Sequence, residues 1–422
     1  MNQRLLLPFL ALVSGACGSM AQTSLGTELD GLEVASDDRD DRDEFDDLGE
    51  TETRTETDPA DRTETDPHVD PGTTDPGTDP GTTDPGTTDP GTTDPGTTDP
   101  GTEPCPAGVI CVDQFPYVTQ DSTTGAPSTL DAYSCSPGTD ESGPEVVYQV
   151  ELDEAGFLAT EVYGLPAGVD VDVHILETLD ADDCVDRGHW NAGALMPAGT
   201  YYVVVDSWVD GSGTAYDGDY TLGIHVTHAG DFTGYGLDHD VFERGLYAFD
   251  AAWFDGETET FVYGLIDFSM PSDQRRFFIV DLLTGDMLFD EYVAHGEGSQ
   301  DPNDIRMAND FSNVSGSHMS SLGMMRAAET YYGSWGYSLR LDGLDGSYND
   351  AVRPRAIVIH PSDYSTASFV NTYGYTGRSW GCPAVDPAIS ADLIDTISYG
   401  ALVLTYAETN GFLSGGRFMP GF

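Results

Sequence analysis

Two residues near the C-terminal end of the sequence, Cys382 and His360, suit nucleophilic chemistry. His360 closes the run 356–359, whose apolar and mostly β-branched side chains predict a buried strand that holds the imidazole rigidly. Cys382 follows Gly381 on a short loop before a predicted helix, where a thiol can be exposed. Because a free thiol needs a base or a positive charge to react, the pair predicts a thiolate nucleophile with His360 as its general base. A small buried thiol and a core histidine are the alternatives.

The residues immediately before Cys382 fit supporting roles. Gly381 lets the backbone approach a substrate carbonyl, and the Gly381 and Cys382 amides predict an oxyanion hole. Ser379 is predicted to orient substrate, and Trp380 to shield the site from water. Arg378 supplies a positive field and can bind a carboxylate through two parallel hydrogen bonds. A loop turn, plain packing and a surface ion pair are the respective alternatives for these three side chains.

The sequence contains six cysteines. Cys17 ends an N-terminal apolar run, and Cys382 stands alone. The other four lie in the middle of the chain, and two disulfides with one free thiol left over indicate an oxidising compartment. Four cysteines permit three pairings, of which we predict Cys105–Cys111 with Cys135–Cys184.

The chain is strongly acidic throughout its length. Its 16 basic residues, all arginine, oppose 74 acidic ones, for a net charge of −58 over 422 residues. Such a surface repels phosphate backbones, so nucleic acid is excluded as a partner. It also disfavours adhesion to anionic membranes, so any membrane attachment must be covalent or apolar.

Residues 1–21 read as an export signal, with an apolar core too short to span a membrane. Lipidation at Cys17, as in an outer-membrane lipoprotein, and ordinary cleavage after Ala21 both fit, and both place the protein in the periplasm or cell envelope. Residues 22–104 are rich in Asp, Glu and Thr and end in TTDPG repeats. Since little of this segment can be buried, we expect a disordered linker.

The sequence of residues 105–228 predicts an antiparallel β-sandwich, because short segments of alternating apolar and polar residues are separated by turn signals. The predicted strands are 146–152, 157–163, 169–175, 201–205 and 220–226. The stretches 195–206 and 218–222 resemble the prepeptidase C-terminal-type sandwich of secreted bacterial enzymes. His174 is expected on the polar face of its sheet. Calcium bound by loop acids, against plain solvation, remains an alternative for Asp206, Asp210, Asp217 and Asp219.

Residues 229–422 predict a β-rich catalytic domain with a few helices. Strands are expected at 260–268, 276–281, 287–289, 337–341 and 401–406, and helices at 322–332 and 386–398. The connection from His295 to Leu322 is long, polar and Gly-rich, which is typical of functional loops. His295, Asn313 and Ser321 are therefore predicted to line the substrate groove, with structural roles as the alternative.

Several motifs follow one another in a specific order: 295–296, 311–313, 320–323, 355–360 and 377–384. Together they resemble the murein L,D-transpeptidase catalytic domain family, a branch of the YkuD-like enzymes. Trp380 stands where the commoner YkuD-like signature has His, and Pro383-Ala384 replaces its usual tail. These departures leave the nucleophile and the base in place and affect substrate recognition.

The resemblance implies that Cys382 attacks the carbonyl of the third residue of a tetrapeptide stem of peptidoglycan and expels D-alanine. The acyl group would then pass to an amine of a neighbouring stem, or to water in an L,D-carboxypeptidase. Arg378 would anchor a stem carboxylate. No cofactor or metal is expected, although zinc bound by His295, His318 and His360 is an alternative. The rival function is a non-catalytic murein-binding or adhesion module.

Overall fold

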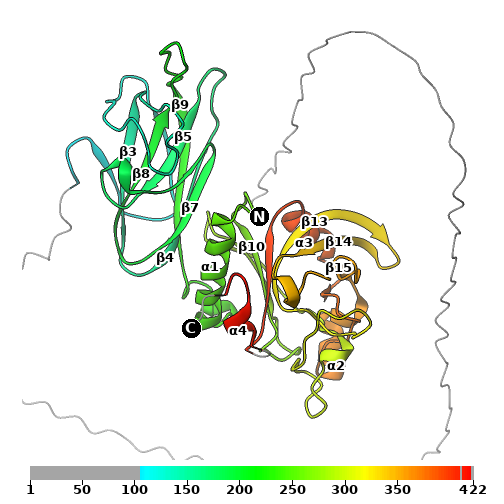
Figure 1. The fold of residues 1–422 in the computed structure, drawn as a ribbon. Coiled ribbons are helices and arrows are strands. Elements are labelled where there is room, and N and C mark those ends of the chain that lie inside the picture. Colours follow the sequence, from blue (N-terminus) through cyan, green and yellow to red (C-terminus); the bar gives the residue numbers. More distant parts are fainter. Residues whose placement is uncertain (1–104, 409–410, 420–422) are drawn as a thin grey trace, which may run out of the picture. The chain divides into compact units, whose positions relative to one another are not determined.

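The computed structural model describes residues 105–408 and 411–419, which belong to one compact unit, residues 93–422 (Figure 1). The predicted signal segment 1–21, the lipidation site Cys17 and the linker 22–104 lie outside the described residues. Within the described part, no helix is long and apolar enough to cross a membrane.

Two sheets form a β-sandwich between residues 109 and 228. The five-stranded sheet has the order β1 (Val109–Val112), β3 (Glu145–Leu152), β8 (Gly199–Ser207), β5 (Val171–Leu176) and β6 (Cys184–Gly188). The four-stranded sheet has the order β2 (Tyr117–Ser122), β9 (Asp219–His228), β4 (Gly156–Tyr163) and β7 (Asn191–Met196). Inward-facing side chains of both sheets form one apolar cluster, as alternation along half-buried strands requires.

All five strands predicted from alternation are present as β3, β4, β5, β8 and β9. The prediction missed β1, β2, β6 and β7, of which β1 pairs with β3 in parallel. These four segments are short or lie at sheet edges, so their sequences alternate weakly. The sandwich is otherwise antiparallel, as predicted.

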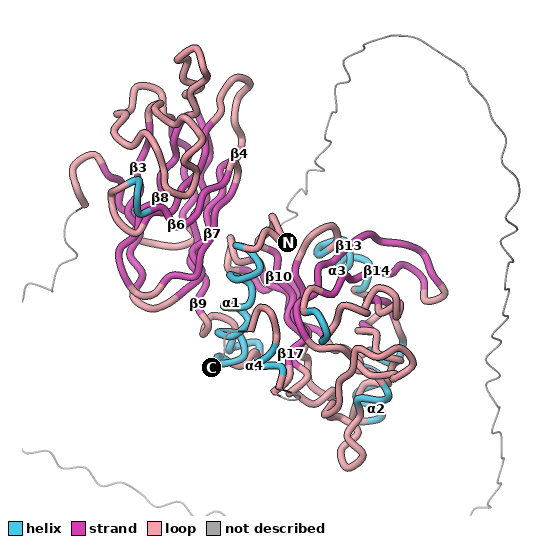
Figure 2. The backbone as a smooth tube through the Cα atoms, in the orientation of Figure 1, coloured by secondary structure: helices cyan, strands magenta, loops and turns pink. Residues whose placement is uncertain are grey.

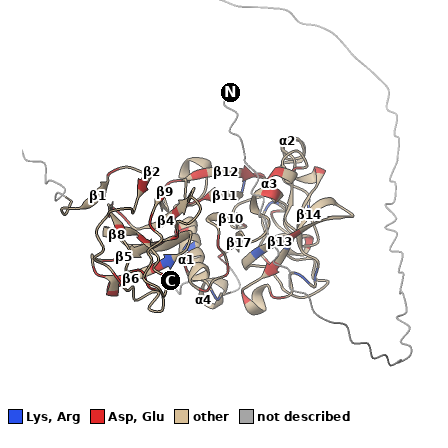
Figure 3. Ribbon diagram, turned by 90° about the horizontal axis from the view of Figure 1, so that it is seen from above, with Lys and Arg blue, Asp and Glu red and all other residues tan. Residues whose placement is uncertain are grey.

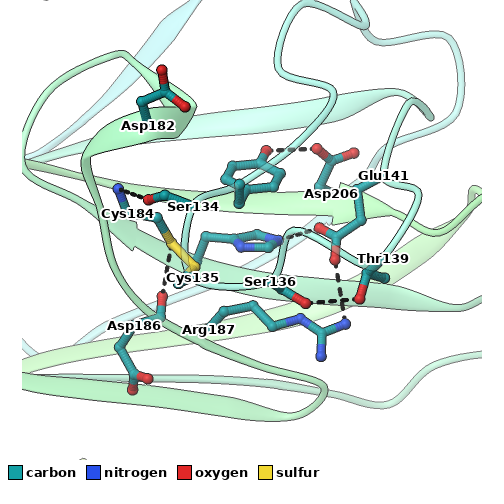
Figure 4. Close-up of a disulfide and its surroundings, with 12 residues drawn as sticks. Ser134, Cys135, Ser136, Thr139, Glu141, Asp182, Cys184, Asp186, Arg187 and Asp206 are labelled. Atoms are coloured by element: carbon teal, nitrogen blue, oxygen red, sulfur yellow. Dashed lines mark hydrogen bonds and ion pairs between the residues drawn. A yellow bond between two sulfur atoms is a disulfide. The ribbon is translucent and has the colours of Figure 1, made fainter.

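Both predicted disulfides are present, Cys105–Cys111 and Cys135–Cys184. Figure 4 shows the second of them. The prediction for His174 is wrong in one respect: the side chain is fully buried instead of lying on an open polar face. The segment that contains Cys135, which a disulfide joins to β6, covers it. The ring of His174 stacks on Tyr133 at 3.7 Å and contacts the buried carboxylate of Glu141. The face is polar as predicted, but residues 130–141 cover it.

A third sheet has eight strands and carries the candidate site. Its order is β12 (Asp286–Glu291), β11 (Phe277–Asp281), β10 (Val262–Asp267), β17 (Leu402–Tyr406), β13 (Gly323–Gly333), β14 (Gly336–Gly343), β15 (Val358–Pro361) and β16 (Ala384–Val385). Four helices accompany it: α1 (His239–Phe254), α2 (Ala367–Tyr373), α3 (Ser390–Ile397) and α4 (Phe412–Gly415). Figure 2 shows that much of the chain between β12 and β13 is loop.

The predicted helix 322–332 is wrong, because this segment is strand β13. Its Met, Ala, Arg and Glu residues favour helix locally, yet β13 pairs with both β14 and β17 in the middle of the sheet. Tertiary pairing therefore overrides a weak local preference. The predicted helix 386–398 begins late: a turn closed by Asp386 leads into α3 at Ser390.

Helix α1 was missed. Asp238 caps its N-terminus, and the Asp238 carboxylate accepts hydrogen bonds from the amides of Asp240 and Val241. Aromatic residues and Gly245 lower its helix propensity, while Phe242 and Phe249 on its buried face stabilise it by packing.

The two disulfides close loops of very different length, which gives a stability prediction. Removing Cys135–Cys184 with paired Ala substitutions should cost about 4 kcal/mol, against about 2 kcal/mol for Cys105–Cys111, from the loop-closure entropy of the unfolded chain. Their sequence separations are 49 and 6 residues. Denaturant unfolding of both variants beside the wild type measures the difference; equal losses would contradict it.

Candidate active site

Parallel pairing of β15 with β16 places Cys382 near His360. His360 lies opposite Ala384 in this pair, and the His360 amide donates to the carbonyl of Pro383. Cys382 is two residues before Ala384, so it precedes the paired segment directly. The sheet therefore brings the backbones of these two residues close together, although 21 residues separate them in the chain.

The Cys382 thiol is half-buried and is the only free cysteine among the described residues. Its Sγ lies 3.7 Å from the carbonyl oxygen of Ala356, and the amide of Val358 also bonds to the sulfur. Burial raises the pKa of Cys382, and the Val358 amide and the Arg355 charge only partly oppose this. At neutral pH in the free protein, Cys382 therefore rests as a thiol.

His360 is buried and held in one orientation. Its Nδ1 lies 2.9 Å from the carbonyl oxygen of Pro361, and its ring stacks on Trp335 at 5.1 Å. Since a carbonyl only accepts, Nδ1 carries the proton and Nε2 keeps its lone pair. Burial lowers the pKa of His360, so the imidazole is neutral at neutral pH and can act as a base. Trp335, which orients the base, was missed by sequence reasoning because only the fold brings it to His360.

Arg355 is a second residue that sequence reasoning did not select for the site. Its pKa is lowered by burial and raised by the charge of Cys382, so the two side chains interact electrostatically. Its hydrogen-bond partners are all neutral: Ser312 O, Ser321 Oγ and Met319 O, each at 2.7 Å, and Ser317 Oγ at 3.3 Å. Arg355 thus fixes the loop 312–321 beside the thiol and supplies a positive charge there.

Ser379 and Gly381 shape the loop that carries the thiol. The Ser379 hydroxyl donates to the Cys382 carbonyl at 2.7 Å and accepts from the Gly381 amide at 3.1 Å. The predicted oxyanion donor at Gly381 is therefore engaged within the loop in the free protein. Gly381 has φ of +112°, and a Cβ there would lie 2.5 Å from the carbonyl oxygen of Met319. Only glycine fits this turn without strain.

A strand-like contact joins the predicted groove residue His295 to this loop. The His295 carbonyl accepts from the Ser379 amide at 3.0 Å, and the Ser379 carbonyl accepts from Glu297 at 2.7 Å. The His295 side chain is almost fully buried and accepts from Arg276 at 2.8 Å through Nδ1. Burial first, then the charges of Arg276 and Arg378, lower the pKa of His295 to about 3, so this imidazole stays neutral.

The other predicted substrate residues lie in different surroundings. Trp380 is 62% exposed and stacks on His318 at 4.4 Å, while Arg378 donates to Gln300 at 3.0 Å. The Ser321 hydroxyl accepts a hydrogen bond from the Arg355 guanidinium. Asn313 lines a separate cavity of about 370 Å³ and bonds to Asp350, Ser347 and Ala351.

The three histidines of the zinc alternative do not share a common centre. His295 faces Arg276, His318 stacks on Trp380 and His360 stacks on Trp335. Asp206, one of the four acids of the calcium alternative, is buried and accepts a hydrogen bond from the Tyr133 hydroxyl at 2.6 Å. Burial raises the pKa of Asp206 to about 9. A carboxyl that stays protonated at neutral pH is a poor calcium ligand.

Comparison with known proteins agrees with this geometry. Residues 234–406 match the family described as L,D-transpeptidase catalytic domain. The sequence resemblance is thereby confirmed for these residues. A comparison with curated proteins gave no match.

Solved structures give weak likenesses. The pre-peptidase C-terminal domain of collagenase from Bacillus anthracis is 17% identical, covering 29% of this chain and 99% of that chain, with a TM-score of 0.20. An L,D-transpeptidase from Mycobacterium smegmatis is 13% identical over 59% of this chain and 82% of that chain, with a TM-score of 0.23. L,D-transpeptidase 1 from Mycobacterium tuberculosis is 14% identical over 35% and 62%, with a TM-score of 0.20. TM-scores this low define no shared fold, so the assignment rests on the family match.

The raised pKa of Cys382 gives a pH prediction. The rate of Cys382 alkylation by iodoacetamide should keep rising with pH above the usual pKa of a thiol, because the thiolate forms only at high pH. The rate should show no plateau near pH 6. Arg355→Gln should slow alkylation at pH 8 by about tenfold, since removal of one nearby positive charge shifts a pKa by roughly one unit. Arg355→Lys keeps the charge and should lose less. A plateau at mildly acidic pH in the wild type would contradict the raised pKa.

Gly381→Ala tests the turn at the nucleophile. The added Cβ meets backbone at 2.5 Å in addition to the strained φ, so alkylation of Cys382 should fall strongly. Gly374→Ala is the matched control, with φ of +79° but open space around the new methyl group. Both variants should lose on the order of 1 kcal/mol of stability to backbone strain. If Gly374→Ala impaired the thiol equally, the close approach at Gly381 would not be the cause.

Proposed function

We propose that this protein is a peptidoglycan L,D-transpeptidase that uses Cys382 as its nucleophile. The observation that supports the proposal is the β15–β16 pairing, which brings the backbone of a free cysteine beside the strand of a buried, neutral and oriented histidine, in a segment that matches the L,D-transpeptidase catalytic domain. The donor substrate is a tetrapeptide stem, whose third residue becomes acylated on the sulfur while D-alanine leaves.

Proton transfer follows from the state of each group. His360 Nε2 takes the proton of the Cys382 thiol as the sulfur attacks, and later returns it to the departing amine of D-alanine. No hydrogen bond joins the two side chains among the described residues, so this contact forms when substrate binds, as catalytic hydrogen bonds often do. The Val358 amide and the Arg355 charge stabilise the thiolate.

The second half of the reaction passes the acyl group to an amine of a neighbouring stem. The attacking amine must lose a proton, and His360 is the base in place to accept it. Water in the same position would release the tripeptide and make the protein an L,D-carboxypeptidase. Ser379 and Gly381 serve catalysis by fixing the loop, and the Cys382 amide supplies an oxyanion donor.

The proposal includes the setting of the enzyme. The family acts on the cell wall, and two disulfides suit an oxidising compartment outside the cytoplasm. We place the mature protein in the periplasm or cell envelope, with Cys17 as a lipid anchor and residues 22–104 as a linker. In this arrangement residues 105–228 are an accessory module and residues 229–422 the catalytic module.

A second candidate function is a murein-binding module that does not turn substrate over. The observation in its favour is the raised pKa of Cys382 together with the lack of a recorded hydrogen bond from the thiol to His360 among the described residues. In that case the fold would recognise stem peptides while the thiol stays inert.

Intact-mass spectrometry separates the two functions. The oxidised protein is incubated with a tetrapeptide stem and, separately, with a carbapenem, with Cys382→Ala as the control. The enzyme should gain a covalent adduct with each ligand, whereas the variant should gain none. His360→Gln should slow adduct formation by 10²-fold or more, because general-base catalysis contributes about that much. A folded wild type that forms no adduct would leave the binding module as the function.

A further inference from the structure

A cavity of about 220 Å³ lies beside the nucleophile loop. Its lining includes Arg378, the residue before Ser379. The Ser379 hydroxyl bonds to the carbonyl of Cys382, so the cavity lies beside the loop that carries the thiol. Its lining combines polar and apolar side chains: His295, Gln300, Ile305, Phe369, Tyr375, Thr376, Gly377 and Arg378.

The His295 side chain presents a fixed hydrogen-bond donor. Arg276 is buried, is held by the carbonyls of Val293 and Met270, and donates to His295 Nδ1 at 2.8 Å. A guanidinium has no acceptor, so Nδ1 carries no proton and the neutral ring must carry it on Nε2. Nε2 is buried and has no hydrogen-bond partner among the described residues. A buried donor without a partner is destabilising, and an acceptor atom of a ligand would remove that cost.

Thr376 gives the cavity a second unmet group. It is 2% exposed, and its hydroxyl has no partner within the described part of the chain. Its amide is already bonded to Ser272 at 3.3 Å, which fixes the backbone at this position.

Arg378 adds positive charge at the same cavity. Seven arginines of the described part form ion pairs with carboxylates, namely Arg187, Arg275, Arg306, Arg326, Arg340, Arg353 and Arg417. Arg378 donates instead to the neutral amide oxygen of Gln300, and no carboxylate lies within ion-pair distance of it among the described residues. In a chain with a net charge of −58, an arginine without an acidic partner marks a place where negative charge can be supplied by a ligand.

We propose that this cavity is a carboxylate-binding subsite for the peptide substrate, in which His295 Nε2–H, the Thr376 hydroxyl and the Arg378 guanidinium donate to one carboxylate. All three residues line the cavity, whose volume of about 220 Å³ suits a carboxylate with a short side chain. Ile305, Phe369 and Tyr375 provide apolar contacts for a group the size of a methyl. This inference rests on the proposed function, since it names how that substrate is held.

The proposal explains why a neutral histidine is needed here. A protonated His295 would lie beside Arg276, and burial together with the neighbouring cations keeps its pKa at about 3. His295 therefore recognises an anion through one N–H group and carries no charge of its own. The Arg378 charge, which is exposed to solvent on one side, draws the carboxylate in.

Two carboxylates of a stem peptide have the required chemistry: that of the C-terminal D-alanine and that of a diacid side chain at the third position. Binding is measured with Cys382→Ala protein, which cannot be acylated, by calorimetry with three peptides. They are the free tetrapeptide, its C-terminal amide and its third-residue side-chain amide. Loss of affinity for only one amide, by about tenfold or more, identifies the carboxylate that enters the cavity.

Thr376→Val removes one donor and nearly preserves shape. In the Cys382→Ala background it should weaken the free tetrapeptide about tenfold and leave the critical amide unchanged. Arg378→Gln should do the same and also remove the salt dependence of binding. Thr372→Val, at an exposed position of α2, is the matched control and should change nothing.

In nuclear magnetic resonance spectra, the His295 Nε2–H signal, assigned with His295→Gln, should shift downfield when the free tetrapeptide binds.

The outcomes separate this inference from the proposed function. If Cys382 forms the acyl adduct but all three peptides bind equally and Thr376→Val has no effect, the carboxylate subsite is overturned and the transpeptidase stands. If no adduct forms but the free tetrapeptide still binds in preference to one amide through Thr376 and Arg378, the subsite stands and the enzyme function is overturned.

Discussion

The site depends on how one short segment, residues 379–385, is held on three sides. β16 pairs with β15, the Ser379 backbone pairs with residues 295–297, and Gly381 lies against the carbonyl of Met319. These contacts are backbone hydrogen bonds and close packing, which tolerate little displacement. The position of the Cys382 sulfur is therefore set by the fold around it, and the loop has no freedom to find its own geometry.

Positive charge is concentrated at this segment in a protein that otherwise carries a large excess of acid. Figure 3 shows acidic residues spread over the described elements and few basic ones. Most described arginines pair with carboxylates, whereas Arg276, Arg355 and Arg378 bond to carbonyls, hydroxyls, an imidazole or an amide. Arg355 and Arg378 lie beside the segment that carries Cys382 and have no carboxylate within ion-pair distance among the described residues, whereas the buried Arg276 interacts electrostatically with Asp267 and Asp273.

The described geometry is that of a resting site. Burial favours the uncharged forms of Cys382 and His360 alike, so the pair avoids the cost of holding a thiolate and an imidazolium in the interior before substrate arrives. In the proposed reaction, substrate binding brings the carbonyl to the sulfur, and proton transfer and bond formation then proceed together. A raised pKa in the free protein is compatible with this sequence, because the proton leaves only when the new bond forms.

The sequence by itself determined the strands of strong alternation, the four cysteines that form disulfides and the identity of the thiol and imidazole candidates, whereas the pairing of those cysteines was one of three choices. Alternation and cysteine position are local signals that survive folding unchanged. Only the tertiary structure decided that 323–333 is a strand, since its pairing with β14 and β17 outweighs helical residues. It also decided which polar residues matter around Cys382: Arg355, Trp335 and Thr376 gain their roles from neighbours distant in sequence. Such roles depend on through-space distances and burial, which no spacing along the chain encodes.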